Sequence, residues 1–367
     1  MVAPAKTRFQ GTKECPTLDC NKAMTLIAAI IFANAKHKPE ESMTRSRTAT
    51  TALFGPILAL AATLALSPLT AAAQSYPDKP VNYYLPFPAG GESDIAARFQ
   101  QDVFRKKYKQ EMVVQYKLGA GGAVAWQTLN AMPADGSNLM GINLPHIVLQ
   151  PLEGQVQYKT EDMTPVFWFH YTPDAIVVPN DSPIKSFQDL VAAAKAKPGE
   201  LSFAGSGTNS ANHVAHEKFN QLAGVKTTYV PFKGTGDLTS AVIGGHVTGA
   251  MSYSTFAIQQ KSKLRMLAVA TEKRLSQFPD VPTFKELGFN WVDGAYRGIA
   301  VPKSMSQEMR TKVSDMMAAI NKDPDMRAKM QEGGFEVIDI SYEKIPAFMA
   351  ERTRDYMGTA KLMGLVK

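Results

Sequence analysis

The chain has 367 residues, of which 45% are hydrophobic and 20% charged, and its formal net charge is +7. This mild basicity comes without any run of basic residues interleaved with aromatic ones, so it gives no sign of nucleic-acid binding. The two cysteines, Cys15 and Cys20, both lie near the N-terminus. The rest of the chain therefore has no disulfide framework, cysteine metal site or cysteine nucleophile.

The first part of the sequence has the layout of a secretory signal peptide. Met43 opens a basic segment, an apolar stretch follows from about residue 52 to 66, and Leu69–Gln74 has the small residues of a cleavage site. We expect translation from Met43, cleavage before about Gln74 and release into the periplasm, with residues 1–73 as an upstream and signal segment. The alternatives are a genuine N-terminal extension or a retained anchor helix.

Strand-like and helix-like segments alternate after residue 74, which predicts an α/β fold of mostly parallel sheets flanked by helices. The expected strands are 81–85, 112–116, 138–144, 167–169 with 175–179, 201–203, 227–231, 249–252, 264–270 and 299–301. The expected helices are 94–108, 123–132, 186–196, 212–222, 238–243, 306–321, 324–333 and 342–363.

The length of this region predicts two domains, because roughly 290 residues exceed what one hydrophobic core usually serves. No low-complexity linker separates them, so the chain is expected to cross between domains inside strands, at His170–Asp174 and Asp293–Arg297. We expect one domain of residues 74–172 plus 297–367 and a second of residues 173–296.

The first of two glycine-rich turns spans Tyr84–Asp94, between a predicted strand and a predicted helix. Gly90 and Gly91 allow a ligand to approach the backbone closely. Ser93 is the expected cap of the helix, and Ser93 and Asp94 suit contact with its N–H groups or with a polar ligand. An ordinary strand-to-helix connection is the alternative.

The second glycine-rich turn spans Ser202–His213. It overlaps the pattern of a dinucleotide site, but the next strand ends at Tyr229–Gly234 without the acidic residue that such a site requires. Its hydroxyl and amide side chains suit carboxylate oxygens instead. Two helix starts that face each other, one from each domain, would hold an anion with their N–H groups and dipoles.

No set of residues resembles an assembled catalytic centre. His213 and His216 lie three residues apart on a predicted helix, but a third metal ligand is not evident, so a metal-dependent hydrolase is only an alternative hypothesis. Neither a nucleophile elbow nor a phosphate-binding loop is present. We therefore predict no enzymatic activity, no cofactor and no metal.

Arg297 stands at the second expected domain crossing. An arginine there suits bidentate binding of a ligand carboxylate, although a surface arginine paired with Asp293 is an equal alternative. Tyr171 and Tyr253 are candidate aromatic walls of the same cleft, although isolated aromatic residues more often belong to a core.

The ordered set of motifs resembles the Bug/TctC family, the solute receptors of tripartite tricarboxylate transporters. The motifs are Tyr76–Pro80, Pro86–Gly91 with Asp94, Gly119–Gly122, Pro133–Gly136, Gly207–Thr208 with His213, Pro231–Gly234, Gly244–Val247, Leu264–Ala270 and Pro279–Thr283. The resemblance covers essentially the whole chain after residue 74. It implies a type II-like periplasmic binding protein whose two lobes close on a small carboxylate ligand and deliver it to integral membrane transporter subunits.

The resemblance also implies the residues that contact the ligand. These are Phe87, Ala89, Gly90, Gly91 and Asp94 in the first domain, Gly207, Thr208, Asn209 and Ser210 in the second, and His146 after the strand 138–144. Di- and tricarboxylates and aromatic carboxylates are the expected ligands, and the protein is expected to be a monomer. A co-receptor for a signalling membrane protein is an alternative that the sequence does not separate from transport.

Two departures from the family pattern affect the charge of the site. Met251–Tyr253 stands where many relatives have an acid, and Tyr296–Gly298 places Arg297 where many have phenylalanine. A lost acid and a gained arginine both favour negative charge, so we expect a ligand with at least two carboxylates.

Overall fold

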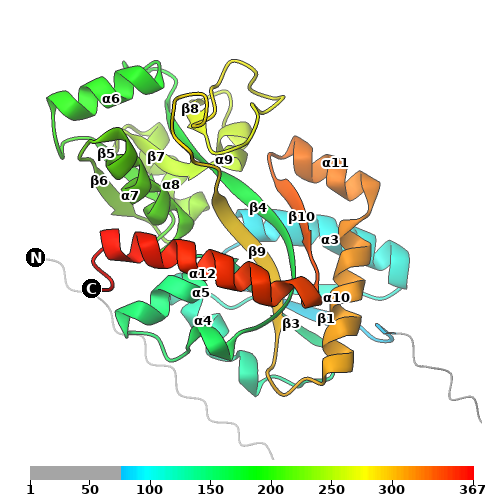
Figure 1. Cartoon of the computed structure of the whole chain (residues 1–367). Helices are drawn as coiled ribbons and strands as arrows, with labels where there is room; N and C mark the ends of the chain where they lie inside the picture. Colours follow the sequence, from blue (N-terminus) through cyan, green and yellow to red (C-terminus); the bar gives the residue numbers. More distant parts are fainter. Residues whose placement is uncertain (1–75) are drawn as a thin grey trace, which may run out of the picture. The chain divides into compact units, whose positions relative to one another are not determined.

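The computed structural model describes residues 76–367, which form an α/β unit of two lobes (Figure 1). The predicted signal segment, its start at Met43 and both cysteines lie outside the described residues. Among the helices that are described, none combines the length and the apolar character needed to cross a membrane.

The first lobe is built on three parallel strands in the order β2-β1-β3, flanked by helices on both faces. Its strands are β1 (Val81–Leu85), β2 (Met112–Tyr116), β3 (Asn138–Leu144) and β10 (Glu336–Ile340). Its helices are α3 (Glu92–Tyr108), α4 (Ala123–Trp126), α5 (His146–Leu149), α10 (Gln307–Asn321) and α11 (Pro324–Glu332). The short strand β10 is absent from the predicted elements, and it pairs antiparallel with the long strand β4 (Thr164–Pro179).

The second lobe repeats this plan with the parallel order β6-β5-β7. Its strands are β5 (Ser202–Gly205), β6 (Thr228–Pro231), β7 (Gly249–Tyr253) and β8 (Leu264–Val269). Its helices are α6 (Phe187–Ala196), α7 (Ala211–Ala223), α8 (Thr235–Ile243) and α9 (Ser254–Gln259). The prediction of sheets flanked by helices in each lobe is therefore confirmed.

Two long antiparallel strands, β4 (Thr164–Pro179) and β9 (Gly294–Val301), connect the lobes. The segments predicted as two strands, 167–169 and 175–179, are parts of one strand, β4. It pairs with β9 up to Pro173 and with β7 and β8 beyond that point. The change of partner occurs within the predicted crossing His170–Asp174. The exact domain limits stay a prediction.

The C-terminal helix α12 (Ile345–Leu362) lies across both lobes. It contacts α5 of the first lobe and α7 of the second. A short 3₁₀ turn, Tyr342–Lys344, precedes it where the sequence predicts α-helix. The helix α12 therefore adds to the contacts between the two lobes.

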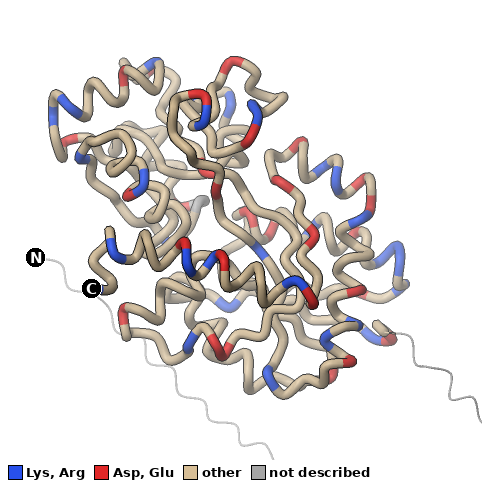
Figure 2. The backbone as a smooth tube through the Cα atoms, in the orientation of Figure 1, with Lys and Arg blue, Asp and Glu red and all other residues tan. Residues whose placement is uncertain are grey.

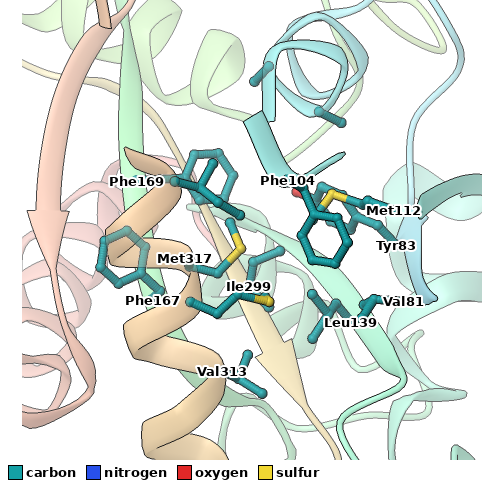
Figure 3. Close-up of a cluster of buried hydrophobic side chains, with 14 of the residues drawn as sticks. Val81, Tyr83, Phe104, Met112, Leu139, Phe167, Phe169, Ile299, Val313 and Met317 are labelled. Atoms are coloured by element: carbon teal, nitrogen blue, oxygen red, sulfur yellow. The ribbon is translucent and has the colours of Figure 1, made fainter. Parts of the chain in front are cut away.

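The core of the first lobe joins the sheet to α3 and α10 (Figure 3). Val81 and Tyr83 of β1 and Phe104 of α3 are buried, and Val313 and Met317 of α10 pack from the other side of the cluster. Burying such side chains contributes roughly 1.5–3 kcal/mol each. This packing holds the N-terminal end of α3 in a fixed position at the carboxyl end of β1.

Two local predictions are wrong in an informative way. Ser93 does not cap α3, because the helix begins two residues earlier than predicted, with Gly91 at its N-cap in an extended conformation and without any side-chain cap. The predicted helix 123–132 is interrupted after Trp126. The hydroxyl of Thr128 donates to the carbonyl of Ala125 at 2.7 Å, which competes with the helical backbone bond.

Candidate functional site

A small cavity of about 30 Å³ lies between the two lobes. This is the space of roughly two water molecules. Its lining is contributed by the β1–α3 turn, by β3 and α5, by β9, and by three positions of the second lobe. The lining residues are Phe87, Pro88, Gly91, Glu92, Ser93, Asn143, His146, Ser206, Gly234, Tyr253, Ala295 and Arg297.

The start of α3 forms one wall of this cavity. Gly91 and Ser93 line it, and no side chain caps the first turn of the helix. The first N–H groups of a helix have no partner within the helix, and they carry the positive end of its dipole. A cavity at this position is therefore suited to a negatively charged group.

Asp94 belongs to the scaffold of this turn and is not among the residues that line the cavity. Its carboxylate accepts the N–H of Gly90 at 2.9 Å and the hydroxyl of Tyr116 at 2.5 Å, and it pairs with Arg98 at 3.1 Å. Burial alone would raise the pKa of Asp94, but the N–H of Gly90, the Tyr116 hydroxyl and the Arg98 charge together lower it. Asp94 thus stays ionised and fixes the turn.

Arg297 is buried in the cavity wall, with 6% of its side chain exposed. Its Nε donates to Ser93 Oγ at 3.3 Å, and one terminal nitrogen donates to Thr172 Oγ1 at 2.5 Å. Its other terminal nitrogen lies 3.5 Å from a carboxylate oxygen of Glu92. The alternative of a surface arginine paired with Asp293 is wrong.

Glu92 is the acidic partner of Arg297, and its side chain is equally buried. Its Oε1 accepts the hydroxyl of Thr255, from α9 of the second lobe, at 3.1 Å. Glu92 is not among the predicted site residues, although its neighbours Gly91, Ser93 and Asp94 are. An acid in the first turn of a helix, within a turn already assigned to binding, was the available signal.

His146 begins the one-turn helix α5 and contributes an imidazole to the cavity. It lies against Phe87 and Trp126, and neither ring nitrogen has a hydrogen-bond partner among the described residues. Burial, together with a smaller contribution from the Arg297 charge, lowers the pKa of His146 to about 3. A neutral imidazole with two unpartnered nitrogens is available to a ligand here.

The second glycine turn contributes less to the cavity than the sequence predicts. Ser206 lines it, whereas Gly207–Ser210 do not. The hydroxyl of Ser210 accepts the N–H of His213 at 3.2 Å and so caps α7, and the N–H of Asn209 donates to the His213 ring. The N–H groups that were expected to bind a ligand are therefore partly used within the protein.

The remaining predicted site residues are divided between the cavity and other places. Phe87 and Tyr253 line the cavity, and the Arg297 guanidinium lies 5.5 Å from the centre of the Tyr253 ring. Tyr171 stacks on Tyr296 outside the cavity. Ala89, Gly90 and Thr208 are exposed. Residues that sequence reasoning missed, besides Glu92, are Pro88, Asn143, Ser206, Gly234 and Ala295.

The two histidines of α7 have partners within the protein. The ring of His216 lies 2.9 Å from the carboxylate of Glu217 and 2.8 Å from the hydroxyl of Thr227. Among the described residues, no three His, Cys, Asp or Glu side chains are grouped as metal ligands would be. The geometry of α7 thus gives no support to the hypothesis of a metal-dependent hydrolase.

The fold and the site together define a two-lobed solute-binding protein. Residues 96–362 match the family described as "Tripartite tricarboxylate transporter family receptor", and the chain belongs to this family. The family resemblance stated from the motifs is therefore confirmed.

Individual relatives agree with this assignment. A Cupriavidus necator protein, "UPF0065 protein in gbd 5'region", is 30% identical over 83% of this chain and 93% of its own length. The solved structure of the periplasmic binding protein BugD is 26% identical, with a TM-score of 0.72 over 79% of this chain and 99% of that one. "R. palustris Rpa4515 with adipate" is 25% identical, with a TM-score of 0.74 over 79% and 98%.

Proposed function

We propose that this protein is a periplasmic receptor that captures a small organic carboxylate between its lobes and delivers it to the membrane subunits of a tripartite tricarboxylate transporter. One observation carries the proposal: an interlobe cavity lined both by the uncapped start of α3 and by the buried Arg297. The family supplies the transporter partner, and the relative Rpa4515 was solved with adipate.

The chemistry of the cavity favours a carboxylate over other small ligands. A guanidinium binds a carboxylate with two parallel hydrogen bonds, and charge-assisted bonds of this kind are about twice as strong as neutral ones. The helix dipole of α3 adds a favourable potential. Ser93, Asn143 and the neutral His146 offer further polar contacts, and Phe87 offers an apolar one. The receptor binds this ligand and performs no chemistry on it.

Capture requires movement of the lobes. The hydroxyl of Thr255 bonds Glu92 across the cleft, and the hydroxyl of Ser254 donates to the carbonyl of Gly334 at 2.7 Å. With these contacts formed, a cavity of about 30 Å³ is smaller than any dicarboxylate. The lobes therefore separate to admit a ligand, and the ligand shifts the equilibrium toward the closed form only by contacting both lobes.

The proposal is tested by a thermal-shift screen of the purified protein against linear, branched and aromatic carboxylates, with the matching amides as controls. An acid present at 100 times its dissociation constant adds about 2.7 kcal/mol to the free energy of unfolding, and this raises the melting temperature. We expect such a shift for at least one acid and for none of the amides. Equal shifts with acids and amides, or no shift with any acid, would contradict the proposal.

A further inference from the structure

We propose that Glu92 makes this cavity selective for a zwitterionic acid, with one carboxylate and one ammonium group on adjacent atoms of its skeleton, over a dicarboxylate. This inference rests on the proposed function and names the ligand class of the same site. It replaces the expectation of a ligand with two carboxylates, which considered Arg297 without Glu92.

Glu92 is held in the cavity by contacts from both sides of the cleft. Its side chain and that of Arg297 are each 6% exposed, and both line the cavity. Thr255 holds one carboxylate oxygen of Glu92 at 3.1 Å, and Arg297 lies 3.5 Å from the other. The contact with Thr255 comes from the second lobe, so the carboxylate is fixed in the cleft when the lobes are together.

The net charge of the cavity disfavours a ligand with two carboxylates. Glu92 and Arg297 are the acidic and basic residues in its lining, and their formal charges cancel. The imidazole of His146 adds no positive charge near neutral pH, because burial lowers its pKa to about 3. A ligand with two carboxylates would bring two negative charges to a buried wall that has no net charge. One of these would lie near Glu92, and like charges in a buried site repel strongly.

The spacing of the two charges in the ion pair matches that of an α-amino acid. In an α-amino acid a single carbon atom separates the ammonium from the carboxylate, so its two charges lie about as far apart as those of Glu92 and Arg297. Placed head to tail against this pair, the ligand carboxylate faces Arg297, Ser93 and the start of α3, while the ammonium faces Glu92. Each ligand charge then lies next to an opposite one, which is the arrangement that buried charges require.

Two series of ligands with equal carbon number test this inference by isothermal titration calorimetry. The four-carbon series is 2-aminobutyrate, butyrate and succinate, and the six-carbon series is norleucine, hexanoate and adipate. In the unmodified protein we expect the amino acid of at least one series to bind about tenfold or more tightly than the diacid of that series. Preferential binding of the diacids would overturn the inference and leave the proposed function intact. Binding of none of the six ligands would overturn the inference, and the proposed function would then be decided by the screen of branched and aromatic acids.

The variant Glu92→Gln keeps the shape of the side chain and its acceptor for Thr255, but removes the charge. We expect it to lose about tenfold or more in affinity for the amino acid and to gain affinity for the diacid. Glu92→Asp keeps the charge and should keep the preference of the unmodified protein. Glu111→Gln, an equal change at an exposed position outside the cavity, is the matched control.

The fold of each variant is checked by urea unfolding before titration. If Glu92→Gln does not fold, the ranking in the unmodified protein and in Glu92→Asp still decides the inference. An unchanged ranking in a folded Glu92→Gln variant would overturn it, because Glu92 would then serve only as the structural partner of Arg297.

Discussion

Two glycine-rich turns that look alike in the sequence lead into helices that differ in whether side chains accept their first N–H groups. The turn before α3 leaves that helix without a side-chain cap, and its first residues line the interlobe cavity. The turn before α7 supplies Ser210 as a cap and Asn209 as a partner for the ring of His213. One helix start is thus available to a ligand, and the other stabilises its own lobe.

A glycine-rich strand-to-helix turn is therefore not by itself an anion site. What decides its role is whether neighbouring side chains already accept the free N–H groups. Charges of both signs are interspersed along the backbone of both lobes (Figure 2). The asymmetry therefore arises from individual side chains and not from an overall difference in charge.

The largest expected effect comes from breaking the ion pair beside the start of α3. Arg297→Gln leaves Glu92 buried without its charged partner, and we expect a loss of about 3–5 kcal/mol in the free energy of unfolding. The double variant with Glu92→Gln should recover a large part of this loss, since it also removes the buried negative charge that Arg297 balances. Urea unfolding measures both. A loss below about 1 kcal/mol in the single variant would show that the pair is well solvated.

The next largest effect is the loss of stability at acid pH that His146, in the cavity wall, should cause. Burial lowers the pKa of His146 to about 3, so the folded protein binds its proton less readily than the unfolded chain does. The stability that His146 contributes is complete above its unfolded pKa of about 6.5 and is lost as the pH falls toward 3. The expected loss across this window is a few kcal/mol.

His146→Phe, which fits the aromatic neighbours Phe87 and Trp126, should remove this part of the acid sensitivity. Urea unfolding at pH 7, 5 and 4 is the measurement, and His246→Gln, at an exposed position, is the control. Parallel pH profiles of His146→Phe and the unmodified protein would contradict the assigned environment of His146.

Substitution of one glycine in each turn tests the difference between the two turns. A Cβ atom at Gly91 would meet only the carbonyl of Pro88 at 3.5 Å, so Gly91→Val should fold, but its methyl groups would enter the cavity. We expect it to weaken binding of the tightest acid by about 100-fold, or ~2.7 kcal/mol. Gly207 has a φ of +87°, so Gly207→Val should lower the free energy of unfolding by about 1–2 kcal/mol.

Calorimetry distinguishes the two glycine variants. The affinity of folded Gly207→Val should stay within about threefold of the unmodified value, because Gly207 does not line the cavity. Equal losses of affinity in both variants would contradict this difference. They would show instead that both turns contact the ligand, as the sequence predicts.

The smallest expected effects come from substitution of Ser210 and Ser93, one serine of each turn. Ser210→Ala removes the cap of α7 and should cost about 1 kcal/mol of stability without changing ligand affinity. Ser93→Ala removes no cap, so its main effect should fall on affinity, through the lost contact with Arg297. Thermal melts and titrations of the two variants give the comparison, and a reversed pattern would exchange the roles of the two turns.

The sequence predicts the fold well because alternating periodicities are local. The strands β1, β2 and β3 are found at their predicted residues, and α10 begins at Gln307, one residue after its predicted start. The prediction is poorer where side chains compete with the backbone, as at Thr128, and at the short strand β10, whose pairing partner is far along the chain.

The site is harder to predict than the fold because its residues meet only in three dimensions. Nothing local indicates that Arg297 lies beside Glu92, 205 positions earlier in the chain, or that Thr255 reaches the same carboxylate. The glycine pattern indicates where the backbone is open to a ligand. It does not show that Ser210 and His213 engage the second turn, because that depends on side-chain orientation.

The most direct test of the account is a crystal structure with the tightest-binding acid from the screen. We predict that a ligand carboxylate oxygen lies within hydrogen-bond distance of Arg297 and of an N–H group in the first turn of α3, with Tyr253 and Ser206 of the second lobe beside it. A carboxylate bound instead at the N–H groups of Asn209–Ala211, away from Arg297, would contradict the account.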